Sequence, residues 1–442
     1  MFTQQRAIYG GKRLLIAFML WLGVLSPVPA MAGGLIAYEV GTADVGLASA
    51  GYNARAQDAS TVLTNPAGMT RLEGTQFLAS GQVLWGNTEF SNDSGTSPLL
   101  GDEDGGRVLG SDGWLPGGGA FLSYSVSPEL KLGFALAGNF GAPLKYDNDW
   151  VGRYYVQETT LLGISLLPSM AYKVTPKLSL GAGLNAMYGI YKNKVAINNA
   201  APAFGDGQLK LDDNDWGWGG NLGLLYEFTA GTRIGLTWNS QVNLDFKGSA
   251  KFSGLAPGLS TRLNNTGVLN SKIKVGIKVP QQLMGSVFTQ VNDRWALLAS
   301  VGWQQWSKFG QVQLGIEDTA NPTDTTADLD FKDTWHGALG AQYRITDPWL
   351  LNFGIAYDSK FQEGSDVSPL LPVNASWRFG LGAQQQVSQT FFWGVAAEYQ
   401  YGGTLDVDLQ SKPVALGGRG DVEGSYDNTA NIFLSLYGSW TF

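Results

Sequence analysis

The chain holds few residues of the types that carry out catalysis. His336 is the only histidine among the 442 residues, and there is no cysteine. His336 with Asp333 and nearby serines could suggest a hydrolase site of the Ser–His–acid type, but a lone histidine followed by a strand pattern is more typical of a packed or rim residue. The missing cysteines exclude thiolate metal sites and cysteine nucleophiles. We therefore expect no enzyme activity.

Other polar motifs give equally weak signals of chemistry. Asp212, Asp213 and Asp215 could offer oxygen ligands to calcium, but their spacing lacks the full ligand pattern of a calcium loop and fits a solvated run of charges. The glycine run 117–119 is followed by no phosphate-binding lysine and opens a strand pattern. The formal net charge of −8 argues against a nucleic-acid footprint. We expect no metal, no cofactor and no nucleic-acid partner.

The first 32 residues have the pattern of a secretory signal peptide. Arg6, Lys12 and Arg13 precede a short apolar run from Leu14 to Leu25, and small residues at 30 and 32 fit a cleavage site before Gly33. The apolar run is too short to span a bilayer, and no later run is long enough for a transmembrane helix. The sequence therefore predicts export of the mature chain from the cytoplasm.

Most of the mature chain alternates between apolar and polar residues with a period of two, which is the pattern of a half-buried strand. In the segment from Leu178 to Ile190, for example, one face is apolar and the other is rich in glycine, which lets another chain segment approach the wall closely. Fourteen such segments are long enough to cross a membrane as tilted strands. They are residues 75–90, 117–127, 131–146, 159–174, 178–196, 215–228, 232–250, 272–291, 295–314, 329–345, 349–361, 374–387, 390–407 and 426–442.

The connections between these segments alternate strictly between short turns and long polar loops. Outer-membrane barrels have this asymmetry, and tryptophans near the segment ends fit their aromatic girdles. The terminal Phe442 lies on an apolar face and matches the end that the barrel-assembly machinery reads in outer-membrane proteins. The sequence thus predicts an all-β fold, a 14-stranded antiparallel transmembrane β-barrel over residues 75–442. A secreted propeller or sandwich is the alternative.

Residues 33–74 do not alternate, and they are rich in small and polar residues. Within them, Asn65 and Pro66 form a turn signal that stops a helix. Fourteen strands enclose more space than their own side chains fill. Composition alone leaves two possibilities open for this segment, a periplasmic tail or a plug inside the lumen.

Several motifs in one order resemble the FadL/TodX family of outer-membrane transporters for long-chain fatty acids and hydrophobic hydrocarbons. The resemblance runs along essentially the whole mature chain. The residues that carry it are Asn65-Pro66-Ala67, Ala137 to Tyr146, Asn214 to Asn221, Trp303 to Phe309, and Phe331 to Trp335 followed by Ala338 to Tyr343.

This resemblance implies a hatch and a gate. Residues 33–74 would form the hatch, with Asn65, Pro66 and Ala67 at its end and Gly33 reaching toward the ligand. A kinked third strand would open a lateral hole in the wall, and a proline there supports this because it has no amide hydrogen to donate to the ladder. A mere bend without passage is the alternative. The predicted gate residues are Gly138, Asn139, Phe140, Gly141 and Pro143.

The resemblance also implies contacts for the ligand. Fatty-acid members hold the carboxylate with basic residues inside the barrel, and the candidates in this chain are Lys192, Lys194 and Lys332, followed by Arg153 and Lys308. Lysines at the extracellular rim are the alternative interpretation, and without a lumenal cation neutral hydrocarbons become the expected substrates. Apolar loop residues suggest an outer groove at Phe204, Leu255, Leu259 and Leu263.

We predict a monomeric protein of the bacterial outer membrane that transports hydrophobic molecules passively. Long-chain fatty acids are the expected substrates, and aromatic or aliphatic hydrocarbons are the alternative. A general porin and a barrel lipase are the competing interpretations. The expected partners are the hydrophobic ligands, outer-membrane lipid and lipopolysaccharide, and the barrel-assembly machinery during biogenesis.

Overall fold

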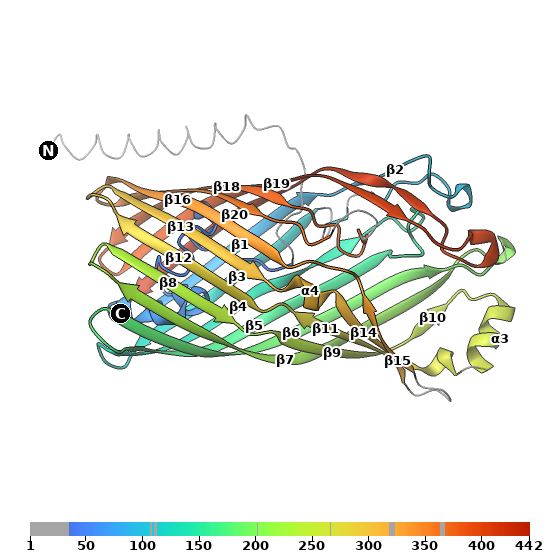
Figure 1. Cartoon of the computed structure of the whole chain (residues 1–442), viewed down its shortest axis with the longest axis horizontal. Coiled ribbons are helices and arrows are strands. Elements are labelled where there is room, and N and C mark those ends of the chain that lie inside the picture. The colour runs from blue at the N-terminus through green and yellow to red at the C-terminus, as the bar shows by residue number, and fades with distance from the viewer. Residues whose placement is uncertain are drawn as a thin grey trace.

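The structure is a computed structural model, and it describes residues 35–106, 108–109, 113–200, 202–265, 267–317, 323–362 and 367–442. The predicted signal peptide, residues 1–32, and Gly33 lie outside the described residues. Fourteen of the described strands close into an antiparallel barrel, because β1 pairs with both β3 and β20 (Figure 1). This confirms the predicted fold class and strand number.

The barrel strands pair around the wall in chain order, each with the barrel strand that follows it. They are β1 (Gln76–Asn87), β3 (Trp114–Ser125), β4 (Leu130–Lys145), β5 (Glu158–Lys173), β6 (Leu178–Ile197), β7 (Gly207–Glu227), β8 (Thr232–Asn239), β12 (Gln282–Gln290), β13 (Trp295–Gln304), β16 (Thr334–Thr346), β17 (Trp349–Asp358), β18 (Ser376–Ser388), β19 (Phe391–Leu409) and β20 (Val422–Thr441).

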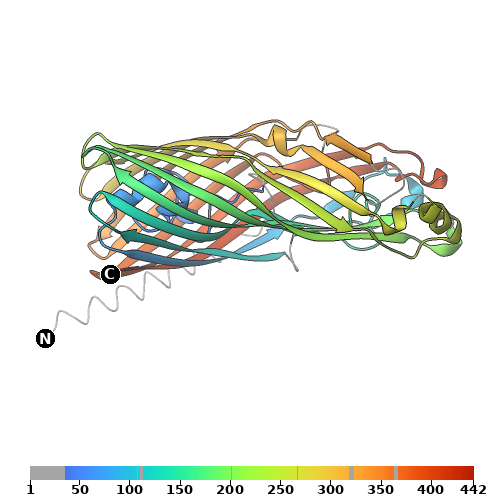
Figure 2. The same cartoon turned by 90° about the horizontal axis from the view of Figure 1, so that it is seen from below.

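The two ends of the barrel differ as predicted. Short turns and the carboxyl terminus lie at one end, and the long connections extend from the other end (Figures 1 and 2). None of the described helices is long and apolar enough to cross a membrane. The small elements of the long connections are β2 (Phe90–Asn92), η3 (Pro98–Leu100), η4 (Pro202–Phe204), β10 (Lys251–Ser253), α3 (Pro257–Asn265), η5 (Val268–Asn270) and η7 (Val414–Leu416).

Side chains on the barrel strands alternate between the lipid-facing and the lumenal side. On β6, Leu184 is 49 % exposed while the inward-facing Met187 is buried. Aromatic side chains form two rows on the outer surface. Near the loops Trp303 pairs with Trp335, and near the turns Phe77 and Phe391 flank Trp440. Such girdles mark the two membrane interfaces of outer-membrane barrels.

Three strands that were predicted to be continuous are each divided into two. They are residues 232–250, 272–291 and 295–314, and each one breaks just beyond the loop-side aromatic row. The breaks fall at residues 240–241, 280–281 and 305–310. Pro280 has no amide hydrogen to donate, which explains why pairing stops there. The outer halves are β9 (Val242–Ser249), β11 (Lys272–Val279) and β14 (Gln311–Glu317), and α4 (Trp306–Phe309) precedes β14.

These outer halves join β15 (Thr323–Asp328) in a second sheet with the order β15-β14-β11-β9. Its buried face is apolar, since every second residue of β9 from Val242 to Phe246 is buried. This face packs on the inner side of the wall, where glycines of β7 leave room for it. A Cβ at Gly217 would lie 2.4 Å from Cγ1 of Val242. The second sheet therefore fills the loop-side half of the lumen with apolar side chains.

Residues 35–74 fold inside the turn-side half of the barrel (Figures 1 and 2), which confirms the hatch and excludes a periplasmic tail for the described part. The hatch has three short helices, η1 (Val45–Leu47), α2 (Thr61–Thr64) and η2 (Pro66–Arg71). Its backbone rests directly on wall glycines. A Cβ at Gly235 would lie 2.0 Å from the carbonyl oxygen of Asn53, and one at Gly354 would lie 2.0 Å from the carbonyl carbon of Leu47.

Candidate functional site

The barrel wall is incomplete between β3 and β4. Their pairing ends at Gly119 and Ala137, although β4 continues to Lys145. The register of β4 with β5 shifts at Asn139, which is a bulge. Next to it, Gly141 has φ +95°, and a Cβ there would lie 1.7 Å from the carbonyl oxygen of Leu161, so the position requires glycine.

All the predicted gate residues lie in this kinked part of β4: Gly138, Asn139, Phe140, Gly141 and Pro143. A cavity of about 400 Å³ lies at the gap in the wall. Its lumenal lining includes Glu39 and Arg378, whereas Leu136 and Ile164, which are 41 % and 37 % exposed, belong to the lipid-facing surface. This lateral cavity is therefore lined by side chains from both faces of the wall.

The first described residues of the hatch, Leu35 to Ala37, pair with the kink. The Ala37 amide donates to the Asn139 carbonyl oxygen at 3.0 Å, and the Gly141 amide donates to the Leu35 carbonyl oxygen at 2.6 Å. Ile36 forms an isolated bridge with Phe140. Ile36 and Ala37 line the lateral cavity on one side and a second cavity on the other. We call residues 35–37 the N-terminal segment, and it separates the two cavities.

The second cavity measures about 50 Å³ and lies between the hatch and the second sheet. Its polar lining consists mainly of amide and phenol side chains, and we call it the amide cavity. None of the residues that line it carries a formal charge. Its polar lining residues are Tyr38, Tyr52, Asn139, Asn185, Asn239, Ser240 and Gln282.

On the loop side of the amide cavity, buried apolar side chains from the hatch, the wall and the second sheet form one cluster. Tryptophan and phenylalanine rings pack within it, and the centroids of Trp306 and Phe361 lie 4.9 Å apart in a stacked arrangement. We call this set the inner apolar cluster. It comprises Leu35, Ile36, Phe140, Leu161, Met187, Val242, Leu244, Phe246, Val275, Ile277, Val279, Trp306, Phe309, Phe331, Phe361 and Val373.

A buried charge cluster ties the hatch to four neighbouring wall strands. The Arg378 guanidinium contacts Glu39 of the hatch, Asp358 at 3.3 Å and Glu398 at 2.8 Å. Nδ1 of His336 lies 2.7 Å from Oδ1 of Asp358. Three carboxylates thus surround one guanidinium, and Glu39 is the only one of them that belongs to the hatch. None of the patterns in the sequence predicted this cluster.

The predicted partner of His336 is different in the structure. Asp333 accepts a hydrogen bond from the Ser307 amide at 3.1 Å, and the His336 imidazole packs against Tyr38 with ring centroids 4.7 Å apart. The histidine is therefore a packed lumenal residue paired with Asp358.

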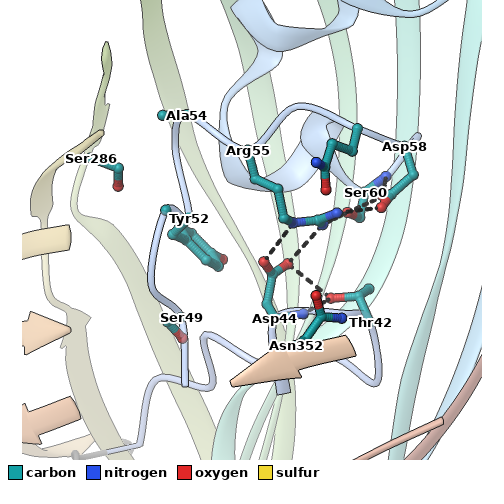
Figure 3. Close-up of polar contacts among 12 residues, drawn as sticks. Thr42, Asp44, Ser49, Tyr52, Ala54, Arg55, Asp58, Ser60, Ser286 and Asn352 are labelled. Carbon is teal, nitrogen blue, oxygen red and sulfur yellow. Dashed lines mark hydrogen bonds and ion pairs between the residues drawn. The ribbon is translucent and has the colours of Figure 1, made fainter. Parts of the chain in front are cut away.

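A second ion cluster holds the hatch itself together. Arg55 contacts Asp44 at 3.2 Å and Asp58 at 2.6 Å, and Thr42 donates to Asp44 at 2.9 Å (Figure 3). All four side chains are buried. Burial raises the pKa of Asp44, whereas the Arg55 guanidinium holds the pKa of Asp58 below its usual range despite burial. The hatch therefore has a polar core of its own.

The predicted carboxylate contacts do not face the lumen. On β6, the Tyr191 ring points inward and stacks on Phe246 at 5.3 Å, so Lys192 and Lys194 point outward. Lys194 donates to Asn148 Oδ1 at 2.7 Å among the loops. The physical reason for this correction is strand parity, since both lysines share a face with the lipid-exposed Leu184.

The other basic candidates are also remote from both cavities. Lys332 and Lys308 are exposed side chains, and Nζ of Lys308 lies 3.5 Å from Oε1 of Gln311. Arg153 forms an ion pair with Asp206 at 2.8 Å in the loops. The structure therefore places none of these three side chains in the lining of either cavity.

The predicted outer-groove residues lie on two long connections. Phe204 in η4 is 57 % exposed, whereas Leu255, Leu259 and Leu263 on and before α3 are half-buried. A Cβ at Gly207 would lie 3.0 Å from Cδ2 of Leu255, so this leucine packs against the base of the loop. A ligand groove at these residues stays a prediction.

The acidic run on β7 has a structural role. Asp213 and Asp215 accept hydrogen bonds from the amides of Lys247 and Asp245 at 2.6 and 2.7 Å. Asp212 pairs with Lys251 at 2.5 Å. Asp213 and Asp215 thus join β9, the edge strand of the second sheet, to the wall, and Asp212 ties β10 to β7.

Comparisons with known proteins agree with this geometry. Residues 24–442 match the family model described as outer membrane protein transport protein (OMPP1/FadL/TodX). The chain is 29 % identical to outer membrane protein P1 of Haemophilus influenzae, covering 78 % of this chain and 81 % of that protein. It is 26 % identical to a long-chain fatty acid transport protein of Salmonella typhi, covering 86 % and 90 %.

Solved structures share the fold. A FadL homologue of Pseudomonas aeruginosa superimposes with a TM-score of 0.77 at 21 % identity, covering 93 % of this chain and all of that one. The toluene transporter TodX of Pseudomonas putida gives 0.64 at 16 % identity, covering 90 % and 99 %. Both likenesses cover at least 90 % of this chain and concern its fold.

Proposed function

Because the chain belongs to the outer membrane protein transport protein family (OMPP1/FadL/TodX), whose members are transport channels for hydrophobic molecules, we propose that it carries long-chain fatty acids across the outer membrane. The relatives named as long-chain fatty acid transport proteins support this substrate class. Aromatic or aliphatic hydrocarbons are the alternative, supported by the shared fold of toluene transporters.

The observation that carries the proposed route is the lateral cavity, because it is lined by lumenal and by lipid-facing side chains at the same gap in the wall. A ligand would enter from the loops and bury its apolar surface in the inner apolar cluster, at about 25 cal/mol per Å². Displacement of the N-terminal segment would then join the amide cavity to the lateral cavity. The ligand would leave sideways into the membrane.

Transport by this route is passive. The chain shows no energy-coupling motif, and the described hatch already reaches the kinked strand without a further subunit. The driving force is the ligand's concentration gradient together with its removal from water at each step.

Filling the lateral cavity tests the route. Gly138 lines that cavity, and a Cβ there would meet no atom within 4 Å, so Gly138→Leu is expected to fold normally and to obstruct the gap. Gly337→Leu is the matched control. A Cβ at this lipid-facing glycine would also meet no atom within 4 Å, and Gly337 lies in β16, away from the gap.

The measurement is the uptake of radiolabelled oleate by cells that carry the wild type, either variant or no copy of the protein. We expect strong loss of uptake for Gly138→Leu only. Full uptake by a folded Gly138→Leu barrel would refute the lateral route. The same cells given labelled toluene separate the two substrate classes, and equal uptake of both compounds with and without the protein would refute the transporter itself.

A further inference from the structure

The amide cavity has the chemistry of a head-group site without a cation. We propose that it receives the polar end of the ligand in an uncharged, hydroxyl-bearing form, which is an alcohol or a protonated carboxylic acid, while the hydrocarbon tail lies in the inner apolar cluster. The inference rests on the proposed function and specifies the form in which the ligand passes.

Two side chains in the lining lack the partners that buried polar groups normally have. The Oδ1 atoms of Asn139 and Asn185 are buried and accept no hydrogen bond within the protein. Asn139 comes from the β4 bulge and Asn185 from the inner face of β6, so two strands direct amides to one small cavity. A buried acceptor without a donor costs about 1–3 kcal/mol, which a matching ligand would recover.

The chemistry of an amide selects the head group. An asparagine side chain offers an N–H donor and a carbonyl acceptor side by side. An alcohol or a protonated carboxyl group also has one donor and at least one acceptor, so it can satisfy both halves of the amide. An ionised head group can only accept hydrogen bonds, so it would leave the Oδ1 atoms of Asn139 and Asn185 without a donor. It would also be buried without a counter-charge, which is the more costly arrangement.

The charge cluster on the far side of Tyr38 opposes an anion. The Arg378 guanidinium lies beyond Tyr38, 5.8 Å from the centre of its ring, and is already contacted by Glu39, Asp358 and Glu398. An anionic head would have to compete with these three carboxyl groups for one guanidinium. Tyr38 separates the cavity from this cluster, and the charge cluster therefore offers no free cation to the head group.

The apolar boundary of the amide cavity sets the direction of the ligand. Ile36, Phe140, Met187, Val242 and Val279 line the cavity and also belong to the inner apolar cluster. A head group among the amides would thus continue directly into an apolar tail region on the loop side. A fatty acid would take up a proton from water before its carboxyl group enters the lumen.

The test compares three ligands with the same sixteen-carbon chain. Radiolabelled 1-hexadecanol, hexadecane-1-sulfonate and hexadecane are bound at equilibrium to the purified, detergent-solubilised full chain. The sulfonate is anionic at every pH used, so no protonation can rescue it. We expect 1-hexadecanol to bind at least tenfold more tightly than the sulfonate, and more tightly than hexadecane.

Asn185→Leu removes one amide and keeps the side-chain size. It should weaken 1-hexadecanol binding roughly tenfold, the effect of about one hydrogen bond, and change hexadecane binding less than twofold. Asn193→Leu, on the same face of β6 but outside the cavity lining, is the matched control and should leave both unchanged. A shift in gel mobility between boiled and unboiled samples reports whether each barrel is folded.

The outcomes separate the inference from the function on which it rests. Equal binding of the sulfonate and the alcohol, or an unchanged affinity of folded Asn185→Leu for the alcohol, would overturn the head-group site. Binding of hexadecane with no preference for the alcohol would overturn it while leaving transport of hydrophobic molecules intact. Failure of the wild type to bind any of the three would contradict the proposed function as well.

Discussion

The contact between Glu39 and Arg378 gives the most informative single perturbation, because it joins the start of the hatch to the wall. Glu39 lies two residues beyond the N-terminal segment and is 2 % exposed. Its Oε1 accepts from Ser49 Oγ at 2.5 Å and contacts the guanidinium. Glu39→Gln keeps the size of the side chain and its ability to accept a hydrogen bond, but removes the charge.

The size of the effect follows from the type of bond that is lost. A hydrogen bond that involves a charged acceptor contributes about 1.5–3 kcal/mol, and one with a neutral acceptor about 0.5–1.5 kcal/mol. The midpoints of the two ranges differ by about 1.25 kcal/mol, which is close to a tenfold change in the equilibrium between the paired and the released N-terminal segment. Arg378 keeps Asp358 and Glu398 as partners, so the barrel itself should stay folded.

The assay is the initial rate of oleate entry into liposomes that contain the purified protein. If release of the N-terminal segment limits passage, Glu39→Gln should raise the rate up to tenfold. Glu398→Gln is the matched control, because it removes the same charge from the same guanidinium but lies in the wall strand β19. It should leave the rate close to that of the wild type.

Two results would refute the reasoning. A wild-type or slower rate for a folded Glu39→Gln barrel would show that this contact does not hold the segment during transport. An equal increase for Glu398→Gln would show that the total charge of the cluster matters and that the position of Glu39 on the hatch does not.

Three further predictions concern the kink, the hatch core and the loops. Gly141→Ala should destabilise the barrel by more than about 1 kcal/mol, measured by urea unfolding, because a Cβ would overlap the Leu161 carbonyl oxygen at a positive φ. Arg55→Met should leave buried carboxylates uncompensated and loosen the hatch by about 3–5 kcal/mol, seen as faster amide exchange confined to residues 35–74. Burial and the hydrogen bond to Asp206 raise the pKa of Tyr154 to about 12, so its loop should be protected from proteolysis below pH 10 and lose protection as the pH rises toward 12. Tyr154→Phe should remove that dependence on pH.

Local patterns predicted the barrel because each strand alternates with a period of two and needs no knowledge of its partners. The glycines on the inner faces were also informative, since Gly235 and Gly354 accept the hatch backbone. The second sheet was missed although Pro280 stood inside a predicted strand, where a proline normally marks an edge or a break.

The charge cluster was harder to predict, because its members lie on different strands. His336, Asp358, Arg378 and Glu398 recur about every twenty residues, the distance along the chain from one strand to the same level of the next. The register of the consecutive strands β16 to β19 then brings the four side chains side by side. That spacing of charged residues on glycine-rich inner faces is the signal that could have revealed them. The prediction that Lys192 faces the lumen was wrong for a simpler reason. Alternate residues of β6 point to opposite sides of the wall, and Lys192 falls on the outward-facing side.

The contact of hatch backbone with wall glycines limits how the channel can open. At Gly235 and Gly354 no side chain separates the hatch backbone from the wall, so we expect the plug to resist leaving the barrel as one piece. The N-terminal segment is joined to the kinked strand by two backbone hydrogen bonds, so we expect opening to begin there. A barrel whose plug stays in place while the N-terminal segment moves would pass a hydrophobic molecule without opening a continuous water-filled pore.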